Sequence, residues 1–140
     1  MGSMPLIGCI AVIAVSTLAG NLAPAQASHG CNARNIEGNY GYMVNGTNVG
    51  NGLVASVGVV SADGEGRLTA TDTVSANGLV LHRTITGTYT VNPACTGSAT
   101  FTDNFGQSTH LDFVLVDRGR EFQFIQTDPA TVTTGVAKKQ

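Results

Sequence analysis

The sequence predicts an all-β protein, namely a single antiparallel up-and-down barrel of about eight strands that follows an N-terminal signal peptide. Three observations lead to this prediction. Beyond the N-terminal apolar run, apolar and polar residues alternate with a period of two, as they do in strands with one buried face. Gly, Asn, Asp and Pro interrupt the alternation at short intervals, which places turns between the strands. The same part of the chain has no segment with the period of an amphipathic helix.

Residues 1–27 have the features of a secretory signal peptide. The apolar run "PLIGCIAVIAVSTLAG" is followed by "APAQA", in which Ala25 and Ala27 give the small-x-small pattern of a cleavage site. We therefore expect cleavage after Ala27, which leaves residues 28–140 as a secreted β-barrel domain. The apolar run is shorter than the roughly 20 residues that a membrane-spanning helix needs, so we expect no stable membrane span after cleavage. The expected location is secreted or periplasmic.

The composition narrows the class of partner. Only 11% of the 140 residues are charged, and the formal net charge is −2. Because the chain has no basic patch, we exclude nucleic acid as a partner. The mature chain of about 113 residues fits one domain.

The alternation places eight strands in order along this domain. They cover residues 36–44, 53–61, 67–75, 79–91, 96–103, 110–116, 121–128 and 131–137. Short connections force sequential neighbours to pair antiparallel, and a long meander tends to close because closure removes its exposed edges. An eight-stranded barrel has an interior that side chains fill or that holds one small ligand. Gly87 interrupts the longest strand, where it predicts a bulge or a bend.

The segment "DTVSANGLVLHR" predicts the central hairpin. Asn77-Gly78 is the strongest short signal for a two-residue hairpin turn, and it sets Asp72 opposite Arg83. The same face pairs Val74 with Leu81 and Ala70 with Ile85. The opposite face is a ladder of threonines, at positions 69, 71, 84, 86, 88 and 90. One face is therefore apolar apart from a single pair of opposite charges.

Neighbouring hairpins extend this apolar face. The turn at Asp63-Gly64-Glu65 predicts three inward pairs, which are Val59 with Leu68, Val57 with Ala70 and Ala55 with Asp72. The second strand then turns Leu53, Ala55, Val57 and Val59 inward, and the first strand adds Ile36, Tyr40, Tyr42 and Val44. The turn within "VDRGRE" pairs Leu115 with Phe122 and Phe113 with Phe124. Its other face contacts water or a partner subunit, which leaves room for a homo-oligomer.

The cysteines predict one disulfide. Cleavage of the signal removes Cys9 and leaves Cys31 and Cys95 in an oxidising compartment, where an even pair is most simply bridged. Such a bridge closes a loop of about 64 residues and stabilises by roughly 4 kcal/mol in the chain-entropy model. The alternative is two free buried thiols.

The Asp72–Arg83 pair has two interpretations. If the apolar face points into the barrel, the pair is buried, and a buried pair is poor evidence for stability. It would then orient the polar end of a ligand or act in proton transfer. The alternative is a half-solvated pair at the barrel mouth that contributes about 0–1 kcal/mol.

Aromatic residues are the other candidate lining of a site. Rings on the inward face either fill a small barrel or form the walls of a ligand pocket. The candidates are Tyr40, Tyr42, Tyr89, Phe101, Phe113 and Phe124.

Signals for catalysis, cofactors and metals are weak. His110 and Asp112 share a strand face and could hold a metal or orient a base, but without a third placed ligand the simpler interpretation is a pair of solvent-exposed polar residues. The cysteines lack zinc-site spacing, no G-x-S-x-G segment is present, and no glycine-rich phosphate loop precedes a helix. We predict no cofactor, no metal and no catalytic residue.

The segments "GTYTVNPACTGSATFTD" and "LDFVLVDRGREFQFIQTDPATVTTG" resemble small exported bacterial proteins, mostly uncharacterised, which look like compact barrels of the calycin or allene-oxide-cyclase type. The specific points are Gly38 and Tyr40 in a G-x-Y, Cys95 after the Asn-Pro turn, and the final "FIQTDPATV". The resemblance covers most of the mature chain. It implies a class that includes cyclases, dirigent-type proteins and carriers of apolar molecules.

Three functions follow. The first is a secreted barrel that binds a small, mostly apolar molecule against aromatic walls, with Asp72, Arg83 or a tyrosine hydroxyl fixing its polar end. The second is a cyclase or isomerase of the allene-oxide-cyclase type, which holds a flexible substrate in a reactive conformation. The third is a ligand-free surface or interaction protein whose barrel is packed solid. An open cavity would favour the first two.

Overall fold

Eight strands follow one another along the chain with only short connections between them. The structure, a computed structural model, describes residues 30–140, so the predicted signal peptide lies outside the described residues. The strands are β1 (Gly38–Asn48), β2 (Gly52–Ala62), β3 (Arg67–Ala76), β4 (Leu79–Val91), β5 (Thr96–Asp103), β6 (Ser108–Val116), β7 (Glu121–Gln126) and β8 (Thr131–Lys139). Two short 3-10 helices accompany them, η1 (Ala33–Ile36) and η2 (Asp117–Gly119).

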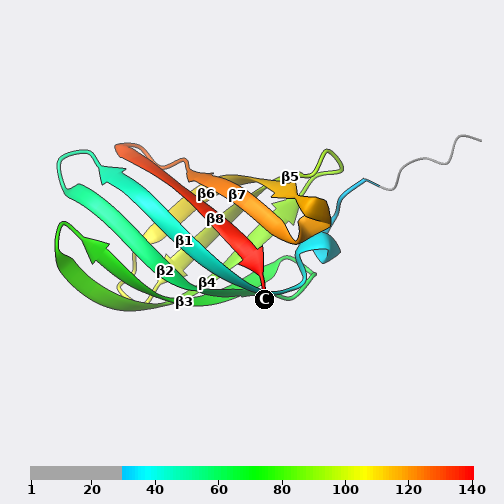
Figure 1. Ribbon diagram of the computed structural model, residues 1–140, viewed down its shortest axis with the longest axis horizontal. Helices are drawn as coiled ribbons and strands as arrows, with labels where there is room; N and C mark the ends of the chain where they lie inside the picture. The colour runs from blue at the N-terminus through cyan, green and yellow to red at the C-terminus, as the bar shows by residue number, and fades with distance from the viewer. Residues whose placement is uncertain (1–29) are drawn as a thin grey trace, which may run out of the picture.

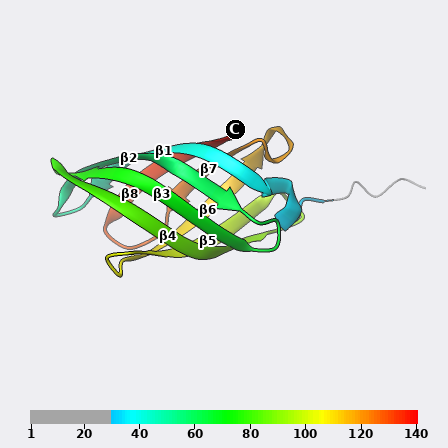
Figure 2. The same cartoon turned by 90° about the horizontal axis from the view of Figure 1, so that it is seen from below.

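The strands close into a barrel. Each strand pairs antiparallel with its neighbour in sequence, and β1 also pairs with β8, through Tyr40–Asn48 and Thr131–Lys139. Figures 1 and 2 show the strands wrapping around a common axis. Closure leaves no strand edge unpaired, as the length of the meander predicts. The predicted fold class, an eight-stranded antiparallel up-and-down barrel, is confirmed.

The two ends of the barrel differ. The β1–β2, β3–β4, β5–β6 and β7–β8 connections lie at one end, and η1 and η2 lie at the other (Figure 1). We call these the loop end and the η1 end. Among residues 30–140, no helix is long and apolar enough to cross a bilayer.

The chain begins its fold with η1 rather than with a strand. The Asn32 side chain accepts a hydrogen bond from the Arg34 N–H, and the Asn35 side chain accepts one from the Asn32 N–H, which together form a capping box. The prediction that Ile36 belongs to the first strand is therefore wrong. Ile36 is nevertheless buried, because η1 turns it against the η1 end of the core.

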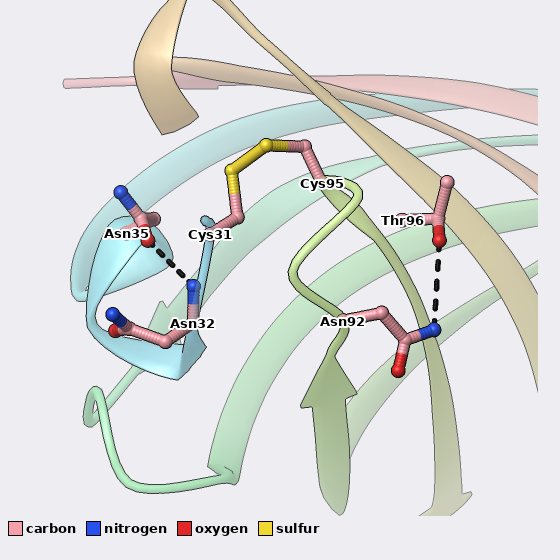
Figure 3. The surroundings of a disulfide bond; sticks show 6 residues. All are labelled: Cys31, Asn32, Asn35, Asn92, Cys95 and Thr96. Carbon is pink, nitrogen blue, oxygen red and sulfur yellow. Dashed lines mark hydrogen bonds between the residues drawn. A yellow bond between two sulfur atoms is a disulfide. The ribbon is translucent and has the colours of Figure 1, made fainter. Parts of the chain in front are cut away.

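The predicted disulfide is confirmed. Cys31 and Cys95 are bonded, with their Cα atoms 4.9 Å apart and a sequence separation of 64 (Figure 3). Beside the bridge, the Cys31 N–H donates to the Pro93 carbonyl oxygen at 3.2 Å. The disulfide therefore ties the segment before η1 to the β4–β5 turn.

The central hairpin has the predicted register. Asn77 and Gly78 have positive φ values of 48° and 88°, as a type I′ turn requires at both central residues. Asp72 lies opposite Arg83, Val74 opposite Leu81 and Ala70 opposite Ile85. The β6–β7 hairpin also matches, with Leu115 opposite Phe122 and Phe113 opposite Phe124.

The predicted register of β2 is wrong. The β2–β3 connection spans residues 63–66, and Ala62 pairs with Leu68, Val60 with Ala70 and Gly58 with Asp72. A register shift by an odd number of residues turns every side chain to the other face. The residues predicted inward, Leu53, Ala55, Val57 and Val59, therefore face outward, and Val54, Ser56, Gly58, Val60 and Ala62 face inward.

Gly87 is not a bulge. The β3–β4 and β4–β5 registers run through it without a break. A Cβ atom at this position would clash with the Thr100 carbonyl oxygen on β5. The glycine is needed because the neighbouring backbone approaches closely.

Candidate ligand-binding cavity

The barrel encloses a cavity of about 590 Å³. This volume lies within the range of roughly 300–1,000 Å³ that small-molecule sites occupy. The cavity extends from Ile36 at the η1 end to the loops at the other end, where Val49, Phe105 and Pro129 border it. The interior is thus not packed solid.

Most of the residues predicted to bind a ligand line this cavity. They are Tyr40, Tyr42, Arg83, Tyr89, Phe101, Phe113 and Phe124. Asp72 does not reach the cavity surface, because Tyr42 and Arg83 cover its carboxylate and leave the side chain 0% exposed. The half-solvated alternative for the ion pair is therefore wrong.

Asp72 is the centre of a polar cluster on one wall. The Arg83 guanidinium forms a bidentate ion pair with the Asp72 carboxylate, in which Nε donates to Oδ1 at 2.9 Å and Nη2 donates to Oδ2 at 2.6 Å. The Tyr42 hydroxyl donates to Oδ2 at 2.8 Å. Every contact to the carboxylate comes from a donor, which is the pairing that a buried carboxylate needs.

Asp103 adds a second carboxylate to the cluster. It ends β5, and its Oδ1 accepts the backbone N–H groups of Phe105 at 2.9 Å and Gln107 at 3.0 Å. Its Oδ2 lies 3.5 Å from Arg83 Nη1, and its side chain is only 4% exposed. Arg83 is therefore flanked by two buried carboxylates.

Gly58 leaves the space in which this cluster forms. It pairs with Tyr42 on one side and with Asp72 on the other, so it lies between them on the inner wall. A Cβ atom there would lie 2.5 Å from Asp72 Cβ and would clash with the Thr71 carbonyl oxygen. The missing side chain lets the Tyr42 phenol reach across β2 to Asp72.

The protonation states follow from these contacts. Burial raises the pKa of Tyr42 far above its ordinary value of 10.0, and the Asp72 charge and hydrogen bond raise it further, so the phenol stays protonated. Burial lowers the pKa of Arg83, but the hydrogen bond and charge of Asp72 outweigh this effect and raise the pKa above its ordinary value. Tyr42 therefore adds a donor but no charge.

The hydroxyls of the other two tyrosines hydrogen-bond to backbone groups at the η1 end. The Tyr40 hydroxyl donates to the Gly119 carbonyl oxygen at 2.5 Å. The Tyr89 hydroxyl donates to the Ala33 carbonyl oxygen at 3.2 Å and accepts the Gly64 N–H at 2.9 Å. Because backbone groups occupy both hydroxyls, Tyr40 and Tyr89 present their rings rather than their hydroxyls to the cavity.

Thr133 is a polar lining residue that the sequence pattern does not predict. It is 5% exposed, lines the cavity from β8, and its Oγ1 has no hydrogen-bond partner among residues 30–140. A buried hydroxyl without a partner costs about 1–3 kcal/mol, so the position is suited to a polar ligand atom. Asp103 and Phe122 also line the cavity and are not among the predicted ligand-binding residues. Asp103 shares the inward face of Phe101, and Phe122 lies opposite Leu115.

Exposed apolar side chains border the loop end of the cavity. Val49 and Phe105 line it there, and both are more than half exposed. A ligand that enters at this end passes an apolar border.

The His110-x-Asp112 pattern does not form a site. Both side chains are on the outer face of β6, but His110 pairs with Asp128, whose Oδ1 lies 2.6 Å from His110 Nδ1. Within residues 30–140, no group of three or more His, Cys, Asp or Glu side chains could hold a metal ion.

Comparisons with known proteins support the fold. No protein-family profile matches the chain, and no curated protein matches it. Among solved structures, a redesigned β-barrel, mFAP1, bound to DFHBI superposes with a TM-score of 0.59 at 16% identity, covering 76% of this chain and 97% of that one. A second redesigned β-barrel, b11L5F_LGL, has a TM-score of 0.57 at 15% identity, covering 77% and 94%. At these identities the likeness shows the fold alone.

Proposed function

We propose that this protein binds a small, mostly apolar molecule inside the barrel. The observation that carries the proposal is the cavity of about 590 Å³, which combines apolar and aromatic walls with a few converging polar groups. Arg83 and the unpartnered Thr133 hydroxyl are the groups that would fix the polar part of the ligand. The Phe101, Phe113 and Phe124 rings would contact its apolar part.

Two further observations support this proposal. The similar redesigned barrel mFAP1 is bound to DFHBI, so a barrel of this type accommodates a ligand. The exposed apolar side chains at the loop end give an apolar ligand a favourable route into the cavity. The alternative of a solidly packed interaction protein does not account for the cavity.

Binding is favoured over the cyclase or isomerase alternative. The buried carboxylate of Asp72 is the candidate base, but three hydrogen bonds from Tyr42 and Arg83 already engage it. Burial and Asp72 raise the pKa of Tyr42, which makes the phenol a weak acid. A general acid or base needs a pKa near the working pH.

The disulfide supports an exported protein. Disulfides persist in oxidising compartments and are rare where thiols are kept reduced. The Cys31–Cys95 bridge therefore fits a secreted or periplasmic location, which agrees with the predicted signal at residues 1–27.

Binding of an apolar dye to paired variants tests the proposed function. We expect Nile red fluorescence to rise when the dye enters the purified protein. Ala70 lines the cavity, and its neighbour Thr71 faces outward on the same strand. Ala70→Phe should reduce dye affinity by about tenfold or more because the ring occupies cavity volume, whereas Thr71→Phe should leave it unchanged.

Circular dichroism must show that both variants are folded. No fluorescence rise with the unmodified protein, or equal effects of the two substitutions, would show that the dye does not bind in the barrel. Either result would contradict the proposed function.

A further inference from the structure

We infer that the cavity selects an uncharged ligand whose polar end is a hydrogen-bond acceptor, such as a carbonyl, ether or hydroxyl oxygen, and that it discriminates against apolar carboxylates. This inference rests on the proposed function and names the ligand class for the same site. It follows from the charge balance of the polar cluster and from which atoms of the cluster face the cavity.

The cluster holds more negative than positive charge. Arg83 faces two carboxylates, those of Asp72 and Asp103, whose side chains are 0% and 4% exposed. Of the described residues that line the cavity, Arg83 alone has a basic side chain. A ligand carboxylate therefore loses its hydration when it enters the cavity, and no unpaired positive charge compensates that loss. Both aspartates would also repel it.

The part of the cluster that faces the cavity is nonetheless a donor surface. The Arg83 side chain is 19% exposed, whereas the side chains of Asp72 and Asp103 are only 0% and 4% exposed. A guanidinium has five N–H groups, and in the described part of the chain two of them hydrogen-bond to Asp72. The remaining N–H groups suit a neutral oxygen acceptor.

The charged residues elsewhere on the molecule do not attract anionic ligands to the loop end of the cavity. The chain has seven Lys and Arg residues, all within residues 30–140. Apart from Arg83, these basic residues lie in the short helices or at the strand ends of the η1 end. They are Arg34, Arg67, Arg118, Arg120, Lys138 and Lys139. The loop end therefore lacks the basic side chains that steer anionic ligands to a binding site.

Competition between two ten-carbon ligands tests the inference. Decanol and decanoate share one apolar chain and differ in the charge of the polar end. At mildly alkaline pH the acid is ionised. We expect decanol to displace Nile red at a concentration on the order of tenfold lower than decanoate, because the carboxylate charge is not compensated in the cavity.

A charge-removing variant makes the test specific to the cluster. In Asp103→Asn the amide oxygen can still accept the Phe105 and Gln107 N–H groups, but the second negative charge beside Arg83 is lost. We expect decanoate affinity to rise severalfold, on the order of threefold or more, while decanol affinity changes little. Asp112→Asn is the matched control, because it removes the same charge from an exposed position on the outer face of β6.

The outcomes separate the two proposals. If Nile red does not bind at all, the proposed function fails. If Nile red binds but decanoate displaces it as well as decanol does, only the inferred ligand class is overturned. Should Asp103→Asn fail to fold, the comparison of the two ligands on the unmodified protein still decides.

Discussion

Gly58 is placed between two side chains that must meet, since Tyr42 and Asp72 pair with it from opposite sides. Its role is steric rather than conformational, because its φ is not in the left-handed region. Glycine in a strand otherwise costs roughly 0.5–1 kcal/mol relative to alanine. Gly58 carries this cost, but the space it leaves allows Tyr42 to hydrogen-bond to the buried Asp72 carboxylate.

Substituting alanine at two strand glycines tests this role. Gly58→Ala should lower the free energy of unfolding by about 1–3 kcal/mol, because its Cβ would overlap Asp72 and the Thr71 carbonyl. Gly41→Ala is the control, since its Cβ would meet only the Gln140 side chain at 3.7 Å. That control should be neutral or slightly stabilising. Urea unfolding followed by circular dichroism measures both, and equal stabilities would contradict the steric argument.

At the scale of elements, the residues of a turn decide whether the sequence predicts the strand register. The β3–β4 register is predictable for this reason, and the β2–β3 register is not. Asn77-Gly78 fits one turn type, so the positions of Asp72 and Arg83 follow from it. The β2–β3 connection contains Gly64 and Gly66, which are compatible with loops of different length, and an odd change in register inverts β2. The strand itself does not resolve this, because both of its faces carry valines.

The same reasoning explains which parts of the cavity are predictable. The aromatic lining follows from alternation within single strands, as for Phe113 and Phe124. Asp103 is not predicted because its contact with Arg83 is diagonal, since Asp103 lies opposite Ile85 rather than Arg83. The unpartnered state of Thr133 depends on what surrounds it across the barrel, which a single strand does not encode.

The disulfide and η1 form one structural unit at the η1 end, and its removal has a predictable cost. The double variant Cys31→Ala/Cys95→Ala should lower the free energy of unfolding by about 4 kcal/mol, because the bridge closes a loop of 64 residues in the unfolded chain. The barrel should persist, since the strand pairing does not involve Cys31. Denaturant unfolding of the oxidised protein and the variant measures the difference.

Reduction of the unmodified protein provides the control. It should lower the unfolding midpoint toward that of the double variant and should leave the double variant unchanged. An oxidised protein no more stable than the double variant would contradict the expected contribution of the bridge.

At the scale of the whole molecule, closure explains why all three tyrosines lie in the barrel interior. The β1–β8 pairing joins the two ends of the described chain and turns the inward face of β1 into the wall of an enclosed space. Tyr40 and Tyr42 lie on that face, and Tyr89 reaches the same interior from β4. The chain contains three tyrosines and no tryptophan, so its tyrosine absorbance reports on the barrel interior alone.

This arrangement predicts a loss of stability at alkaline pH. Burial raises the pKa of each tyrosine above the ordinary value of 10.0, helped at Tyr40 by Tyr89 and at Tyr42 by Asp72. Above pH 10 the folded protein therefore holds protons that the unfolded chain releases. The free energy of unfolding consequently falls as the pH rises through that region, and the contribution is fully present below it.

Ultraviolet titration measures this effect directly. Tyrosinate absorbance of the native protein should stay low as the pH passes 10, and should then rise together with the loss of the circular dichroism signal. The same protein in concentrated urea is the control, and its tyrosines should titrate near their ordinary pKa because no barrel shields them. A native protein whose tyrosines ionise near pH 10 without unfolding would mean that the phenols reach bulk solvent, which is incompatible with a closed barrel that encloses them.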